Sequence, residues 1–133
     1  MPPEKIIFGY YLTLDIYDCD PKTVGSLAIS YRFLDNMPSV LNVYKLSQPF
    51  VVYTDEKKYP DKAGVSGWIP LLDNKNKTFG GVSIHTLTPT NFISIDVYCN
   101  RKFNTEKIKK FTQETFHPQK IESSFKKRGK GFK

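Results

Sequence analysis

The residues of this sequence that could do chemistry are few, and they gather in "TFGGVSIHTLTPTNFISIDVYC", residues 78–99. This stretch contains His85 and, two residues earlier, Ser83, while Ser66 lies upstream in a "GVSG" run. A histidine beside hydroxyl groups can hold or transfer a proton near neutral pH. Because alternate residues of a strand share a face, we expect Ser83 and His85 to point the same way. Without further context, Ser66 could equally bond to a turn, and His85 could be a strand histidine with a purely structural hydrogen bond.

The two cysteines indicate neither a metal site nor a disulfide framework. Cys19 and Cys99 lie far apart, with no CxxC pair and no Cys/His spacing of the kind that binds zinc. We expect both to be free thiols, and we expect no metal.

The elements that position these residues follow from hydrophobic pattern and turn signals. Asp20 and Pro21 open a helix as N-cap and first residue, and a second helix begins at the Asn-Thr-Glu of residues 104–106. The predicted strands cover residues 5–17, 43–54, 65–72, 78–86, 91–99 and 119–125, and the predicted helices cover residues 19–37 and 104–116. This order predicts an α+β two-layer sandwich, in which two helices cover an antiparallel or mixed sheet.

Length and composition predict one domain over residues 1–133. A chain of 133 residues with 39% hydrophobic residues can bury one core but is too short for two. Residues 1–11 carry no signal-like apolar run, and no segment approaches the roughly 18 apolar residues of a membrane span. We therefore expect a soluble, cytoplasmic protein with no membrane partner.

The net charge of +7 is concentrated in the last quarter of the chain. Lys126, Lys127, Arg128, Lys130 and Lys133 form a basic tail over about residues 123–133. Such a tail can attract nucleic acid, anionic lipid or a phosphorylated ligand, or it can be merely solvated. Nucleic acid is disfavoured as a partner, because only Phe125 and Phe132 accompany the basic residues.

Three blocks together resemble the prokaryotic pyruvoyl-dependent S-adenosylmethionine decarboxylases. They are "FGYYLTLDIYDCD" (residues 8–20), "GVSG" (64–67) and "SIHT" (83–86), the last followed by "SIDVYC". The resemblance covers about residues 5–130, and the succession of GVSG and SIHT is its most specific part. It implies the fold of that family, here called S-adenosylmethionine decarboxylase-like, with Ser66 and His85 as catalytic residues.

The sequence departs from the family where the cofactor forms. In the family, a Glu-Ser pair just upstream of Ser/Thr-Ile-His cleaves the chain and becomes the pyruvoyl group. The matching positions here are Phe79 and Gly80, and no serine occurs between Ser66 and Ser83. A glycine has no hydroxyl with which to form the ester, so we expect no self-cleavage, no pyruvoyl and no other cofactor.

Other substrate-contacting positions differ as well. Leu87-Thr88-Pro89 replaces the family's Trp-Pro-Glu, Tyr10-Tyr11 replaces Arg-His, and Asn100 stands in register with the proton-donating cysteine. Tyr53 or Tyr59 is a candidate to stack on an adenine. With the resemblance in view, the predicted substrate-binding residues are Ser83, Tyr53, Tyr59, Phe79, Gly80, Thr88, Tyr98 and Asn100.

A sulfonium substrate can be cleaved without an electron sink. Its own carboxylate can attack the activated γ-carbon, giving homoserine lactone and methylthioadenosine, if the pocket holds the chain curled and excludes water. Loss of the ribose-binding glutamate would also admit a 3′-phosphate. The resemblance thus favours a lyase acting on S-adenosylmethionine or its adenylated conjugate (SAM-AMP), of the kind found in phage and antiviral signalling.

Two alternatives from other classes remain open. A catalytically dead homologue could regulate an active decarboxylase, or the chain could be a module that only binds the ligand. By analogy with the family and the phage lyases we expect a homo-oligomer, with a trimer favoured.

Overall fold

A computed structural model describes residues 7–131 of the chain. Six strands and three α-helices make up these residues, with a 3₁₀ turn, η1, at Thr88–Thr90. The strands are β1 (Gly9–Tyr17), β2 (Phe50–Thr54), β3 (Gly64–Asp73), β4 (Thr78–Leu87), β5 (Phe92–Cys99) and β6 (Lys120–Arg128). The helices are α1 (Pro21–Val24), α2 (Leu27–Val40) and α3 (Thr105–Phe116).

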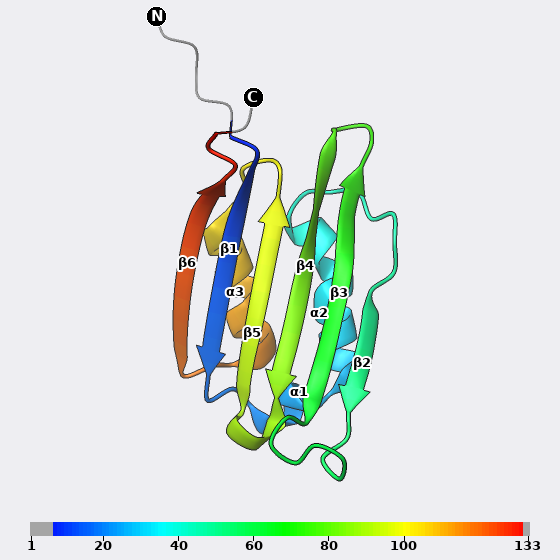
Figure 1. The fold of residues 1–133 in the computed structure, drawn as a ribbon, viewed down its shortest axis with the longest axis vertical. Coiled ribbons are helices and arrows are strands. Elements are labelled where there is room, and N and C mark those ends of the chain that lie inside the picture. The colour runs from blue at the N-terminus through cyan, green and yellow to red at the C-terminus, as the bar shows by residue number, and fades with distance from the viewer. Residues whose placement is uncertain (1–6, 132–133) are drawn as a thin grey trace, which may run out of the picture.

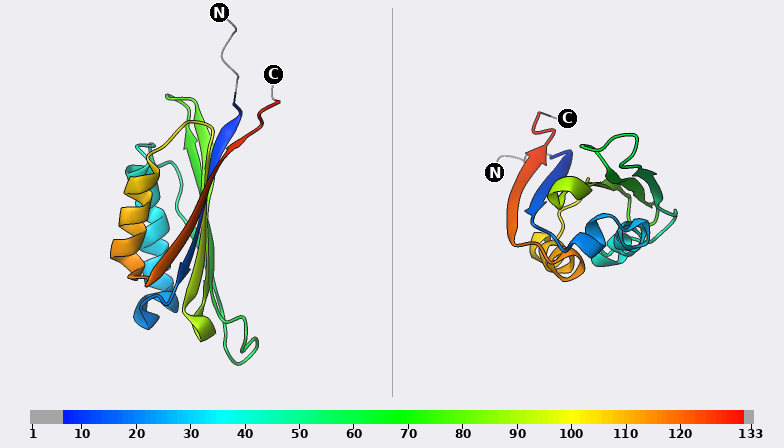
Figure 2. Two further views of the ribbon diagram at one scale, coloured as in Figure 1. Left: turned by 90° about the vertical axis from the view of Figure 1, so that its left-hand side faces the viewer. Right: turned by 90° about the horizontal axis from the view of Figure 1, so that it is seen from below.

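The six strands form one sheet in the order β2-β3-β4-β5-β1-β6. Every neighbouring pair is antiparallel, as Figure 1 shows. The helices all lie on one side of the sheet (Figure 2, left). The architecture is therefore an α+β two-layer sandwich, as the sequence predicts, and the sheet is antiparallel rather than mixed.

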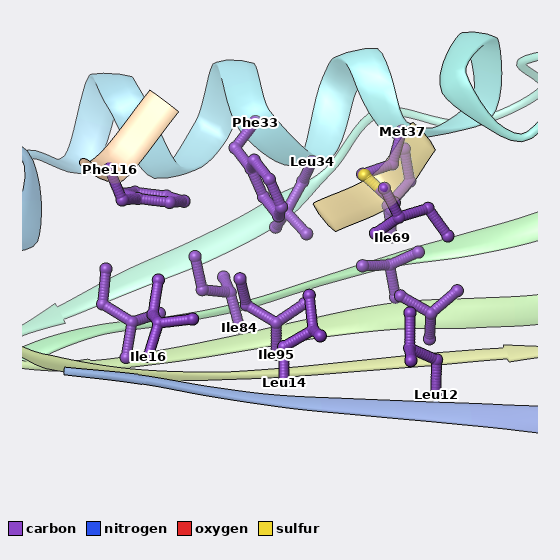
Figure 3. Close-up of a cluster of buried hydrophobic side chains, with 14 of the residues drawn as sticks. Leu12, Leu14, Ile16, Phe33, Leu34, Met37, Ile69, Ile84, Ile95 and Phe116 are labelled. Atoms are coloured by element: carbon purple, nitrogen blue, oxygen red, sulfur yellow. The ribbon is translucent and has the colours of Figure 1, made fainter. Parts of the chain in front are cut away.

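The hydrophobic core fills the space between the helices and the sheet. Phe33, Leu34 and Met37 of α2 and Phe116 of α3 are almost fully buried against apolar strand residues. Figure 3 shows these side chains directed toward Leu14, Ile84 and Ile95 of the sheet, among others. The central strands β1, β3, β4 and β5 contribute alternate residues, because strand side chains alternate between the two faces.

The first predicted helix is in fact two helices. Asp20 caps α1 by accepting a hydrogen bond from the Lys22 backbone N–H at 3.1 Å. The chain then leaves the helical path at Gly25, and Ser26 caps α2 through a 3.1 Å bond from the Ile29 N–H to its hydroxyl. Gly25 weakens the helix and Ser26 offers a second cap, so the segment restarts there.

Two strands also differ from their predicted limits. The predicted strand 43–54 is ordered as a strand only over β2, because α2 continues to Val40 and Pro49 cannot donate to a ladder. The first predicted strand begins at residue 5, and its residues 5 and 6 lie outside the described residues. At the other end, residues 123–128 of the expected basic tail belong to β6, which pairs with β1 along its whole length.

The second face of the sheet carries no helix within residues 7–131 (Figure 2). We call it the open face. Register and burial place Ser66, Trp68, Pro70 and Leu72 of β3 and Phe79, Gly81, Ser83 and His85 of β4 on it. None of the helices in this part of the chain is long and apolar enough to cross a membrane.

Candidate functional site

Ser66 and His85 meet on the open face. They are directly opposite each other in the β3–β4 ladder, and Ser66 Oγ lies 2.9 Å from His85 Nδ1. Both side chains are exposed. Because Nδ1 is engaged by the serine, Nε2 is the ring nitrogen that can meet a ligand. The pair therefore offers an oriented imidazole on the surface of the sheet.

A shallow hollow of about 540 Å³ lies beside this pair, along the same face. Ser83, two residues before His85 on β4, is opposite Trp68 of β3 and Asp96 of β5. We call the hollow the aromatic hollow, because most of its side-chain surface comes from rings and apolar groups. Its lining residues are Tyr11, Trp68, Pro70, Leu71, Leu72, Phe79, Gly80, Gly81, Ser83, Asp96 and Tyr98.

Gly81 lets the indole of Trp68 approach the floor of the hollow. A Cβ at position 81 would lie only 2.6 Å from Trp68 Nε1. Trp68 itself is 48% exposed, so one face of its ring remains available. An exposed aromatic face over a glycine is suited to stacking on a planar base.

Gly80 leaves no room for a side chain. A Cβ at position 80 would lie 2.0 Å from the backbone oxygen of Tyr98 and 2.9 Å from Cα of Cys99. These are backbone atoms of the neighbouring strand β5, which cannot turn aside as a flexible side chain would. Position 80 therefore does not fit a serine side chain in this paired strand, and a pyruvoyl group has no serine there from which to form.

Tyr11, Asp96 and Arg128 form a linked group at the β1 side of the hollow. Burial raises the pKa of Tyr11, and the negative charge of Asp96 and its hydrogen bond with Tyr11 raise it further. The positive charge of Arg128 acts in the opposite direction. The Arg128 guanidinium carbon lies 5.4 Å from the centre of the Tyr11 ring. Tyr11 thus carries a neutral hydroxyl between an anion and a cation.

The structure brings half of the predicted substrate-binding residues into one hollow. Phe79, Gly80, Ser83 and Tyr98 all line it. Ser83 and His85 lie on the same face, as strand alternation indicates.

The other four predicted residues lie elsewhere or are already engaged. Tyr53 is opposite buried Val65 and so points to the helix side of the sheet, and Tyr59 is in the loop between β2 and β3. The Thr88 hydroxyl is within 3.3 Å of the Glu56 carboxylate and 3.2 Å of the Ala63 carbonyl. Neither tyrosine is therefore placed to stack on a base in the aromatic hollow.

Asn100 fixes the backbone at the start of β4. Its side-chain oxygen accepts a hydrogen bond from the Phe79 N–H at 2.9 Å, and its amide donates to the Lys77 carbonyl at 2.9 Å. Both polar groups thus serve the strand end rather than a ligand. Cys99, next to it, is buried on the helix side, and this burial raises the pKa of its thiol.

Sequence reasoning missed Trp68, Asp96 and the role of Tyr11. Trp68 could have been found from alternation, since it lies two residues after Ser66 and must share its face. Asp96 and Tyr11 depend on β1 lying next to β5, a pairing between strands far apart in sequence. No local pattern predicts that neighbour.

Comparisons with known proteins place this arrangement in context. A family model described as S-adenosylmethionine decarboxylase matches residues 10–129. The fold resembles the crystal structure of the adenosylmethionine decarboxylase from Aquifex aeolicus, with a TM-score of 0.70 over 92% of each chain at 18% identity. No curated protein sequence matches the chain.

Proposed function

The chain belongs to the S-adenosylmethionine decarboxylase family, and from that premise we propose that it is a cofactor-independent lyase acting on a sulfonium nucleoside. The substrate is S-adenosylmethionine or its adenylated conjugate. Its carboxylate oxygen attacks the γ-carbon, the bond from that carbon to sulfur breaks, and the bonding electron pair stays on sulfur. The products are homoserine lactone and methylthioadenosine, free or still joined to the adenylate.

The observation that supports this proposal is that the Ser66–His85 pair and its hollow are present although position 80 has no serine. Position 80 has no serine hydroxyl and no space for a serine side chain in the paired strand, so formation of a pyruvoyl group, and decarboxylation through it, has no support. The Ser66–His85 pair and the hollow beside it are present nonetheless. Lactone formation needs positioning rather than an electron sink, because the cationic sulfur already activates the carbon.

Each part of the site has a task in this reaction. Trp68 stacks on the base, and the Asp96 carboxylate attracts the positive sulfonium and ammonium groups. His85, held by Ser66, hydrogen-bonds the methionine carboxylate and keeps it near the γ-carbon. Residues two apart on a strand are separated by about 6.6 Å, so His85 is within a methionine chain's length of the hollow at Ser83.

A second copy of the chain would cover this shallow hollow, because the reaction is faster when water is excluded. A homo-oligomer, with a trimer favoured, would supply that cover. Light scattering at micromolar protein should then give a mass near three times the 15.3 kDa of one chain. A monomer at that concentration would contradict closure by self-association.

The direct test is incubation of the purified protein with S-adenosylmethionine and with its adenylated conjugate. Chromatography with mass spectrometry should detect homoserine lactone and the thioether product, with no release of carbon dioxide. The intact mass should be that of one uncut chain of 15.3 kDa. Two fragments, or decarboxylated substrate, would overturn the proposal. Tight binding without any product would instead support the regulatory or ligand-binding alternative.

A further inference from the structure

A second hollow, of about 460 Å³, adjoins the first on the open face and has a different chemistry. Its lining is Tyr11, Thr13, Ser124, Lys126 and Arg128. Two cations and three hydroxyls thus line one space, and Tyr11 belongs to both hollows. We call Thr13, Ser124, Lys126 and Arg128 the cationic strip.

The cationic strip is held by strand pairing. Lys126 is directly opposite Tyr11 in the β1–β6 ladder, and Arg128 is opposite Gly9. Because side chains alternate, Lys127 between them belongs to the helix-facing side, like Phe125, whose ring stacks on Tyr10. The basic run therefore separates into two residues that face the hollow and one that does not.

The cations of the strip are not neutralised by ion pairs. Within residues 7–131, the ion pairs formed join Lys45 to Asp35 and Lys109 to Glu106. Asp15 and Glu122 are the acids on the open side of the same two strands. They are opposite each other in the β1–β6 ladder, two residues along from Thr13 and Ser124. Lys126 and Arg128 lie at the opposite end. Two cations therefore face the carboxylate of Asp96, which is opposite Thr13 on β5, and the strip keeps a net positive charge next to the aromatic hollow.

We infer that the cationic strip is a phosphate subsite, and that the ligand of the open face is a nucleotide whose base and sugar occupy the aromatic hollow. Arginine and lysine beside hydroxyls form the donor set that phosphate oxygens prefer. Two strand spacings, about 10 Å, separate the strand of Tyr98 from β6, a span that a nucleoside and its phosphate can bridge. This inference rests on the proposed function for the adenosine part, and it favours the adenylated conjugate over S-adenosylmethionine.

The test uses the single tryptophan of the chain, Trp68, as a reporter in the aromatic hollow. Fluorescence titration, repeated by calorimetry, compares methylthioadenosine with adenosine 3′-monophosphate. The variants are Lys126→Gln and Arg128→Gln, with Lys127→Gln as the matched control that removes the same charge from the other face. We expect the phosphorylated probe to bind about tenfold more tightly, and this preference to fall in the first two variants alone.

Two further measurements distinguish a phosphate subsite from general attraction by positive charge. Inorganic phosphate should displace adenosine 3′-monophosphate but not methylthioadenosine, and salt should erode the preference because ions screen exposed charges. Equal affinity for the two probes would overturn the subsite. An equal loss in Lys127→Gln would also overturn it, since general attraction by net charge would then suffice. Because the titrations need no turnover, a protein that shows the preference but forms no lactone contradicts the lyase and keeps the subsite.

Discussion

On the helix side of the sheet, Leu14, Ile84 and Ile95 are fully buried under α2 and α3, whereas the open face presents Ser66, Trp68 and His85 without cover. A single strand supplies members of both sets through alternation, as Ile84 and His85 of β4 show. The covered face holds the apolar area whose burial stabilises the fold. The open face holds the hydrogen-bonding and charged groups that can meet a ligand. The two faces can therefore change independently, and chemistry can be lost or replaced without repacking the core.

Gly80 shows where this independence ends. It belongs to the helix-facing register of β4, yet it borders the aromatic hollow and touches the β5 backbone. Position 80 is part of a continuous strand, Thr78–Leu87, and is paired with Cys99 of β5. A side chain at position 80 would therefore disturb the β4–β5 pairing, whereas substitutions at the exposed positions of the open face would not.

The largest expected effect is on stability. The same substitution, phenylalanine to alanine, should cost much more on the covered face than on the open face. Phe33→Ala should lower the free energy of unfolding by about 3 to 5 kcal/mol, because Phe33 is only 1% exposed in the core. Phe79→Ala, at a ring 41% exposed on the open face, should cost about 1 kcal/mol. Urea unfolding followed by circular dichroism measures both. Equal losses would show that the open face also carries core-like packing.

The next effect is on turnover. His85→Ala should reduce kcat/KM for the sulfonium substrate by about 100-fold, because the carboxylate is no longer held near the γ-carbon, with a thermal midpoint close to that of the unmodified protein. The other histidine gives the control: His117 ends α3 with a φ of 49°, a conformation that asparagine tolerates, so His117→Asn should keep both activity and fold. Full activity in His85→Ala would show that His85 has a purely structural role.

A smaller loss is expected for Ser66, which acts through His85 as a positioning residue. Ser66→Ala removes the 2.9 Å hydrogen bond to Nδ1 and should lower kcat/KM by about 2- to 10-fold, the equivalent of one hydrogen bond. Ser66→Thr keeps a hydroxyl and suits a strand, so it should restore the rate. The pH–rate profile should shift in the alanine variant alone. An unchanged profile with equal rates in both variants would argue against orientation of the imidazole.

Much of the fold could be predicted because its signals are local. The hairpin of β3 and β4 follows from two alternating segments around a polar tip, where Asp73 accepts hydrogen bonds from the Asn76 N–H at 3.1 Å and the Tyr44 N–H at 3.2 Å. The split between α1 and α2 was missed, although Gly25 and Ser26 both indicate it. The length of β6 was missed because lysines are weak strand formers, and its pairing with β1 is a tertiary effect.

The site was predictable only along single strands. Ser83 and His85 share a face by alternation, and Ser66 joins them through the adjacent hairpin strand. Tyr53 was misplaced because the register of β2 against β3 decides its face, and that register is not a local property. Tyr11, Asp96 and Arg128 come from three strands, and only the order β5-β1-β6 brings them together.

The smallest expected effect concerns the thiols and tests whether the covered face takes part in catalysis at all. Burial raises the pKa of Cys19 from 9.0 to about 12, and burial also raises that of Cys99. The folded state therefore holds these protons more strongly than the unfolded chain. Their contribution to stability is complete below about pH 9 and is lost as pH rises toward 12, because the unfolded thiol ionises first. The decline in unfolding free energy above pH 9 should thus be shallower in Cys19→Ala than in the unmodified protein.

At pH 8, iodoacetamide should label neither cysteine in the folded protein and should label both in urea. Treatment of the folded protein should leave turnover unchanged, and the Cys99→Ala substitution should also leave it unchanged. Loss of activity on labelling the folded protein would show that a thiol takes part in the reaction. The covered face would then not be purely structural.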